Sequence, residues 1–270
     1  MSAATSDRLM WIDSHAHLEM KEFDPDRDVV IERARAAGVS QIVTVGTNLS
    51  LSRKAVALTR KYETVYATVG IHPHDAVRAG LSVFDELKSL AGEGKVVAYG
   101  EIGLDFFHHH SPRQAQIDAF GAQLELASEL GLPIVIHDRD AHQETLSMVG
   151  ASGLRRGVFH CFSGDWAMAK QCLDLGFYLS VPGVVTFEKS KMLQDVVRQA
   201  PLDRLILETD CPYLTPSPYR GKRNEPSYLV HTALKVAQIR NLPPEDLARA
   251  TTQNTRNLFG LPEPEAAVEP

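Results

Sequence analysis

The chain has 270 residues, 44% of them hydrophobic, and a formal net charge of −6 at pH 7. This length and apolar content suffice for one substantial core, and parallel barrels of this size usually form a single domain. The acidic balance argues against a constitutive nucleic-acid coat, because such proteins hold phosphates through an excess of basic residues. An enzyme with a locally basic cleft remains compatible with this composition.

The cysteines and the apolar runs bear on the compartment. No apolar run has the roughly twenty residues that a membrane span needs, and the leading MSAATSDR lacks the apolar segment of a signal peptide. Cys161, Cys172 and Cys211 show neither Cys-x-x-Cys pairing nor the density of a disulfide scaffold. We therefore expect a soluble cytoplasmic protein with no membrane partner and no obligate protein partner.

Short β-rich runs alternate with helical periodicity along the chain. In order, the predicted strands cover residues 9–15, 41–46, 65–71, 96–102, 133–138, 157–162, 176–181 and 204–210. Amphipathic stretches predict helices over 26–38, 51–62, 83–91 and 112–130, with Gly38, Gly94 and Gly131 near their ends. Runs such as QIVTVG and PIVIH are apolar almost throughout, which is typical of parallel strands covered on both faces. The pattern predicts an α/β fold, a single-domain TIM (β/α)₈ barrel.

The same pattern sets the predicted domain boundaries. Residues 1–8 precede the first strand and form an N-terminal extension, and residues 9–260 form the barrel domain. Residues 261–270, LPEPEAAVEP, are rich in Pro, Glu and Ala, a composition that cannot build a packed core. We expect this segment to be a flexible tail.

The first predicted strand ends in two histidines, within LMWIDSHAHLEM. His15 and His17 are two residues apart, so an extended strand projects both imidazoles to the same side. Two converging imidazoles can bind a metal, and the alternative is a histidine pair on a solvated strand. Asp13 has the same parity and is predicted to support the site from below, the alternative being an ion pair at the strand end.

Other predicted strands also end in candidate ligands. Glu101 lies at the end of the fourth strand, His137 of the fifth, His160 of the sixth and Asp210 of the eighth. Barrel closure would bring these side chains together at the carboxyl ends of the strands, where such barrels build their active sites. Imidazole and carboxylate ligands suit zinc, manganese, iron or nickel, while magnesium prefers oxygen.

The number of candidate ligands favours two divalent ions, Mg, Mn or Zn, because one tetrahedral site needs fewer groups. We assign His15, His17 and Asp210 to one ion and His137 and His160 to the other, with Glu101 shared. Water between two cations becomes a nucleophile near neutral pH, and Asp210 could accept its proton. Asp210 and Glu101 are therefore the predicted catalytic residues, and the predicted chemistry is hydrolysis.

Six segments together carry a family resemblance: DSHAHLEM, VGIHPHDA, GEIGLDFF, LPIVIHDRDA, FHCFSGD and LETDCPYLTP. In order and spacing, from residue 12 to residue 258, they resemble the TatD family of metal-dependent deoxyribonucleases in the amidohydrolase superfamily. The resemblance implies a TIM barrel and a divalent-metal phosphodiesterase that acts on DNA, commonly as a 3'-5' exonuclease. It implies metal ligands at His15, His17, Glu101, His137, His160 and Asp210. The segment FFHHHSP after GLD departs from the family pattern.

Several further residues are candidates for substrate contact. The long loop CPYLTPSPYRGKRNEPSYL leaves the metal rim, and Arg220 and Arg223 are predicted to bind phosphates, ahead of Lys222. The alternative is a solvated turn. His72, at the end of the third strand, is predicted to orient a substrate phosphate or support a ligand, or else to be a satisfied rim histidine.

Two other groups have predicted roles near the metals. Glu208 shares the strand parity of Asp210, points inward, and is predicted to support a metal ligand, because an unpaired buried carboxylate is costly. His108, His109 and His110 are excluded from the ligand set, because adjacent residues point in different directions. In their loop, Phe106 or Phe107 either touches a base or simply packs.

The leading hypothesis is a divalent-metal-dependent deoxyribonuclease, a 3'-5' exonuclease on single-stranded or frayed ends, with DNA as a transient partner. A second hypothesis is a two-metal hydrolase of a small molecule such as a lactone, amide or phosphotriester, because one barrel rim supports many reactions. A third is a metal-binding scaffold without catalysis. The open water position of a bridged site argues against the third.

Overall fold

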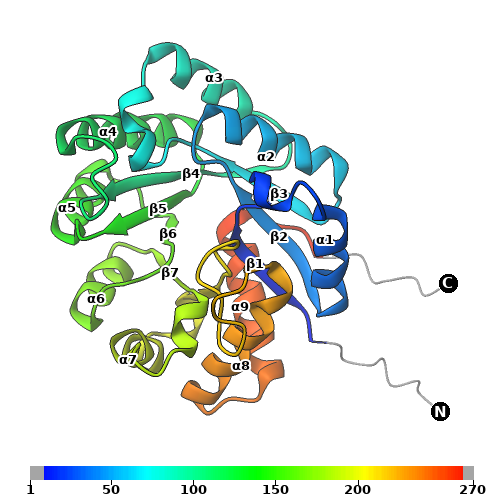
Figure 1. The fold of residues 1–270 in the computed structure, drawn as a ribbon. Helices are drawn as coiled ribbons and strands as arrows, with labels where there is room; N and C mark the ends of the chain where they lie inside the picture. Colours follow the sequence, from blue (N-terminus) through cyan, green and yellow to red (C-terminus); the bar gives the residue numbers. More distant parts are fainter. Residues whose placement is uncertain (1–8, 264–270) are drawn as a thin grey trace.

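The computed structural model describes residues 9–263, in which eight parallel strands are hydrogen-bonded in the order of the sequence. Helices follow the strands and surround them (Figure 1). The predicted α/β barrel of a single domain is thus confirmed. The predicted N-terminal extension, residues 1–8, and residues 264–270 of the predicted tail lie outside the described residues.

The strands are β1 (Trp11–Ala16), β2 (Val39–Val45), β3 (Val65–Val69), β4 (Val96–Asp105), β5 (Ile134–Arg139), β6 (Gly157–Phe159), β7 (Tyr178–Val181) and β8 (Leu205–Leu207). The helices are α1 (Arg27–Ala36), α2 (Leu49–Lys61), α3 (Leu81–Ala91), α4 (Arg113–Leu130), α5 (His142–Ser152), α6 (Trp166–Asp174), α7 (Lys191–Gln199), α8 (Leu229–Arg240) and α9 (Pro244–Phe259). Short 3-10 helices are η1 (Lys21–Phe23), η2 (Pro73–Arg78), η3 (Gly183–Thr186), η4 (Leu202–Arg204) and η5 (Pro226–Tyr228). Within the described residues, no helix combines the length and the apolar character that crossing a membrane requires.

All eight predicted strands are present, but their ends differ from the prediction. β6 ends at Phe159 and β8 at Leu207, so His160 and Asp210 lie on the segments that follow the strands. Cys161 and Asp210 have φ of +44° and +55°, and this left-handed backbone turns the chain at the rim. Among the predicted helix ends, Gly131 caps α4 in the left-handed region, whereas α3 already ends at Ala91, before Gly94.

The barrel closes between β1 and the segment after β8. Ala16 and Cys211 form a parallel bridge, and the Asp210 N–H donates to the His15 carbonyl at 2.9 Å. Asp13 is fully buried beside this seam, where its carboxylate accepts both the N–H of Thr209, at 2.9 Å, and its hydroxyl, at 2.6 Å. These contacts fix the residue before Asp210 against β1, which contains His15 and is followed directly by His17.

The opposite end of the barrel is apolar. Buried residues from seven strands form one cluster, which is possible only inside the barrel: Ile12, Val43, Val45, Tyr66, Ala98, Val135, Val158 and Ile206. Leu258 and Phe259 of α9 and Leu261 join this cluster, and the Gln41 side chain donates to the Pro262 carbonyl at 3.1 Å. Residues 261 and 262, which the sequence assigns to the tail, therefore pack against the barrel. A functional site can therefore lie only at the other end of the barrel, which is polar.

One glycine permits the close approach of β4 and β5 beside that polar end. Gly103 pairs with His137, has φ of +145°, and an added Cβ would lie 1.9 Å from the His137 carbonyl oxygen. Neither the backbone angle nor the space allows another residue there. Because β4 carries Glu101 and β5 carries His137, this approach also sets the distance between two candidate ligands.

We expect Gly103→Ala to lower the free energy of unfolding by at least about 3 kcal/mol, because it combines backbone strain with a clash against main chain. Gly131→Ala is the matched control: its φ is +65° and an added Cβ meets nothing within 4 Å. That variant should lose only about 1 kcal/mol. Urea unfolding followed by circular dichroism measures both, and equal losses would contradict the packing argument.

Candidate metal centre

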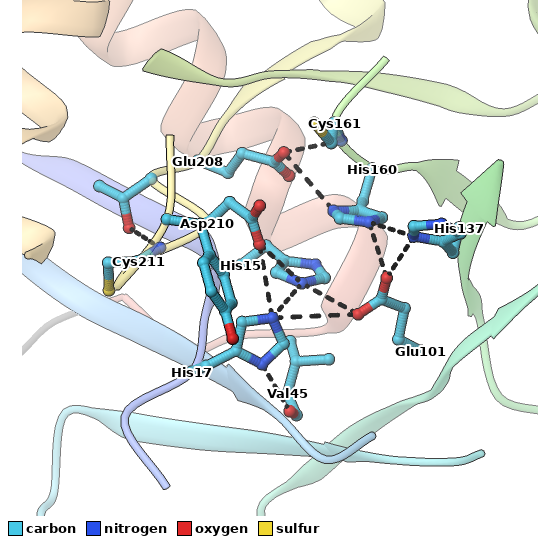
Figure 2. Close-up of polar contacts among 12 residues, drawn as sticks. His15, His17, Val45, Glu101, His137, His160, Cys161, Glu208, Asp210 and Cys211 are labelled. Carbon is cyan, nitrogen blue, oxygen red and sulfur yellow. Dashed lines mark hydrogen bonds and ion pairs between the residues drawn. The ribbon is translucent and has the colours of Figure 1, made fainter. Parts of the chain in front are cut away.

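The six predicted ligands converge at the carboxyl ends of the strands, around a cavity of about 570 Å³. The side chains of this group, all of them at least four-fifths buried, are His15, His17, Glu101, His137, His160 and Asp210. Five of them line the cavity, and His15 lies behind them. The structure therefore brings together every residue that the sequence assigned to the metal site (Figure 2).

His15, His17 and Asp210 form the first group. Their atoms His15 Nε2 and His17 Nε2 lie 3.3 Å apart, and Asp210 Oδ1 lies 3.7 Å and 3.4 Å from them. Ligands bound tetrahedrally at 2.0–2.1 Å lie about 3.3 Å apart, as zinc sites require. The three atoms therefore fit around one small divalent ion.

Glu101, His137 and His160 form the second group. Glu101 Oε1 lies 2.8 Å from both His137 Nδ1 and His160 Nε2, and these two nitrogens lie 3.4 Å apart. The other oxygen, Glu101 Oε2, faces the first group and lies 3.4 Å from His15 Nε2. Figure 2 shows the carboxylate between the two sets of imidazoles. Each Glu101 oxygen thus faces one group of ligands, as is needed for a carboxylate that bridges two ions.

His72 lies at the edge of the second group, with Nε2 3.4 Å from Glu101 Oε1. Burial lowers the pKa of His72 to about 4, so its imidazole is neutral at pH 7. Its Nδ1 accepts the N–H of His74 at 3.1 Å, so the single ring proton is on Nε2. His72 can therefore donate to Glu101 or to a substrate oxygen, which agrees with its predicted supporting role rather than with metal binding.

Carboxylates face the ring nitrogens that point away from the cluster of candidate ligands. His17 Nδ1 donates to the Val45 carbonyl at 3.0 Å and faces Glu19 at 3.2 Å, and Glu19 also accepts the Thr44 hydroxyl. Glu208 lies 3.6 Å from His160 Nδ1, on the inward side that its strand parity predicts. The hydrogen bond from His17 Nδ1 fixes Nε2 as the nitrogen of that ring that is free for a metal. In both rings Nε2 faces the cluster.

Glu19 and Asp105 are two supporting residues that the sequence reasoning missed. Asp105 Oδ2 lies 3.3 Å from His137 Nε2, so His137 lies between two carboxylates. The available signals were the alternation of Glu19 with His15 and His17, and that of Asp105 with Glu101 along β4. Asp13 bonds Thr209, the residue before Asp210, rather than a ring nitrogen, and burial raises its pKa to about 7.

Charged neighbours shift the pKa values of the buried site residues in the direction opposite to the effect of burial. Burial raises the pKa of Glu101, but the positive charge of His160 and the hydrogen bonds from His137 and His15 outweigh this and hold the pKa well below its usual value. Burial lowers the pKa of His17 and His160, yet their carboxylate neighbours raise both well above the usual value. Without a cation, the histidines therefore hold protons to neutralise the carboxylates. A divalent ion can replace those protons.

The predicted phosphate-binding arginines lie away from the cavity lining. Arg223 is held by Asp26 through contacts of 2.9 Å and 2.7 Å and packs on the Phe23 ring, and Arg220 packs on Phe187. A third arginine, Arg139, does line the cavity, at the end of β5. Among the described residues, no carboxylate pairs with the Arg139 guanidinium, which lies over the Phe107 ring. Sequence reasoning missed it, although it lies two residues after His137.

The arrangement can hold two cations that share one carboxylate, with a cavity in front of them. Asp210 and Tyr213 lie on one wall of this cavity, and His72 and Arg139 also line it. Sites of this kind hydrolyse esters of charged acids, because paired cations acidify water and neutralise the developing charge. The observed geometry therefore supports the predicted chemistry.

Comparisons with known proteins agree with this geometry. The family described as TatD related DNase matches residues 12–260. An uncharacterised metal-dependent hydrolase, YabD of Bacillus subtilis, is 42% identical over 254 residues, which are 93% of this chain and 100% of that protein. The 3'-5' ssDNA/RNA exonuclease TatD of Cronobacter sakazakii is 42% identical over 250 residues, which are 90% of this chain and 95% of that one.

Solved structures show the same similarity. The TatD homologue YjjV of Escherichia coli superposes with a TM-score of 0.89 at 31% identity, over 93% of this chain and 98% of that one. A dihydroorotase has a TM-score of 0.64 at 16% identity and covers 96% of this chain and 74% of that one. At that identity the second similarity extends to the fold alone.

We expect metal binding to release protons at neutral pH. The raised pKa values of His17 and His160 mean that both rings are protonated at pH 7, whereas metal ligands are neutral imidazoles. Calorimetric titration of metal-free protein with Zn²⁺, in buffers of different ionisation enthalpy, should show release of about two protons and tighter binding as pH rises. Heats that do not depend on the buffer would contradict the proposed ligand set.

Proposed function

Because this chain belongs to the TatD-related DNase family and is a metal-dependent hydrolase, we propose that it removes nucleotides from the 3' ends of single-stranded or frayed DNA. The observation that carries the proposal is the position of Glu101 between two groups of ligands. A closed structural site would use its ligands to surround one ion, whereas a shared carboxylate leaves room for water and substrate.

In the proposed site, His15, His17 and Asp210 would hold one divalent ion, His137 and His160 would hold a second, and Glu101 would be shared. Bound there, the ions would supply the acidity that makes water a nucleophile near pH 7 and the charge that neutralises a phosphodiester. In the metal-free site, hydrogen bonding from His17 outweighs burial and lowers the pKa of Asp210, which is anionic at pH 7. Asp210, at the cavity wall, can therefore take the proton of the attacking water.

The cavity supports an end-on substrate. Its volume of about 570 Å³ is that of a site for a small ligand. Arg139 can bind a phosphate through its guanidinium, and Tyr213, whose ring is half exposed at the cavity, can stack on a base. A site that takes the terminal nucleotide of a strand needs these two contacts, because every nucleotide has a phosphate and a base.

We expect Glu101→Gln to reduce metal-dependent cleavage by about 10³-fold or more while preserving the fold, because a neutral amide cannot neutralise two ions. Asp210→Asn should show a similar loss. The control is Glu125→Gln, an exposed residue of α4, which should be fully active.

The assay uses a 5'-labelled single-stranded oligonucleotide with Mg²⁺ or Mn²⁺. A ladder that shortens from the 3' end supports the proposal. Unchanged cleavage by Glu101→Gln would contradict the site, internal cuts would contradict the exonuclease, and faster hydrolysis of lactones, amides or phosphotriesters would favour a small-molecule substrate.

A second prediction separates two arginines. Arg139→Ala should raise KM for the oligonucleotide about tenfold, with little change in kcat or Tm, because a charge-assisted hydrogen bond to phosphate is lost. Arg223→Ala should leave KM nearly unchanged and cost about 1 kcal/mol of stability, because Arg223 pairs with Asp26. A larger KM effect at Arg223 or at Arg220 would favour the assignment made from the sequence.

A further inference from the structure

A separate group of imidazoles surrounds one carboxylate on the wall of the same cavity. We call it the side cluster: His74, Asp105 and His108. Asp105 Oδ2 lies 2.7 Å from His74 Nε2 and 2.8 Å from His108 Nδ1, and one ligand atom from each residue lies within 4.8 Å of the others. His74 and His108 both line the cavity, so the cluster can be reached from it.

The hydrogen bonds of Asp105 exceed what its carboxylate can accept. Oδ1 accepts the backbone N–H groups of Phe107 and His108, at 3.0 Å and 2.9 Å, which occupy both of its lone pairs. Oδ2 has two lone pairs but three ring nitrogens around it, from His74, His108 and His137. The Nε2–H of His137 accounts for one lone pair. The second lone pair of Oδ2 faces the imidazoles of His74 and His108 together, as the oxygen of a metal ligand would.

Hydrogen bonds between two side chains and the backbone hold the side cluster in place. The Gln116 side chain bonds both the N–H and the carbonyl of Asp105, at 2.8 Å and 2.9 Å, and is itself buried. The Ser111 hydroxyl donates to the His74 carbonyl at 2.8 Å, and Gln116 donates to the Ser111 carbonyl at 2.9 Å. The segments that carry His74 and His108 are therefore tied to each other through two side chains. Supports of this kind orient metal ligands.

Exposure also distinguishes the side cluster from an ordinary buried network. Asp105 is fully buried, whereas the His74 and His108 side chains are 33% and 45% exposed. A cation can therefore reach the carboxylate without unfolding the loop, and water can complete its coordination. The ring of His110 lies 4.4 Å from that of His74, between centroids, and provides a further nitrogen donor nearby.

We propose that His74 Nε2, Asp105 Oδ2 and His108 Nδ1 form an additional divalent-cation site, distinct from the centre around Glu101. Two nitrogens and one carboxylate oxygen favour a transition metal such as zinc, manganese or nickel over magnesium. His137 stays with the centre and donates its Nε2–H to Asp105, so the two sites share a hydrogen bond but no ligand. The proposal holds whatever the substrate of the centre is.

The test counts bound metal, so it does not depend on any activity. Wild-type protein is loaded with Zn²⁺, dialysed against a buffered free-zinc series, and its zinc content is measured by mass spectrometry. His108→Ala should hold one equivalent fewer than wild type at free zinc that saturates the wild type, with that equivalent weakened about 100-fold or more. His74→Ala is the second variant and should lose the same equivalent.

His109→Asn is the matched control, because His109 is exposed, lies between the two loop histidines, and has φ of +53°, which Asn tolerates. It should bind as many zinc ions as wild type. Equal zinc content in wild type, His108→Ala and His74→Ala would overturn the proposal and leave the cluster as a hydrogen-bond network. Circular dichroism confirms that each variant is folded before its metal is counted.

Discussion

The structure depends on one buried carboxylate. Glu101 is 2% exposed, its two oxygens face different groups of imidazoles, and a charge at that depth is tolerable only with partners of opposite sign. Protonated histidine rings supply this positive charge, and a divalent cation can supply it in their place once the rings have lost their protons. This exchange suits the site to a divalent cation, because the same atoms that hold protons are placed at ligand distances from one another.

The fold meets this requirement through parallel strands. The candidate ligands come from the carboxyl-terminal halves of β1, β4 and β5 and from the segments that follow β1, β6 and β8. Closure of the barrel beside Asp13 and Thr209 then sets Asp210 against the two histidines at the end of β1. The left-handed backbone at Asp210 is a local cost that these buried hydrogen bonds offset.

A layer of carboxylates lies behind the imidazoles. Glu19 and Glu208 each face the Nδ1 of a histidine, and Asp105 faces the Nε2 of His137. The hydrogen bonds to Glu19 and Asp105 fix the tautomers of His17 and His137. Asp105 connects this layer to His74 and His108, so the polar network continues along the cavity wall beyond the centre.

The sequence by itself determined the eight strands and the convergence of the six predicted ligands, because periodicity fixes a strand and parallel strands end at one rim. Only the tertiary structure decided the partners of loop residues. Arg223 meets Asp26 across 197 residues, Arg139 is left facing the cavity, and His74 and His108 meet at Asp105. Loop paths follow no period, because they are set by long-range contacts, and no local pattern in the chain encodes those.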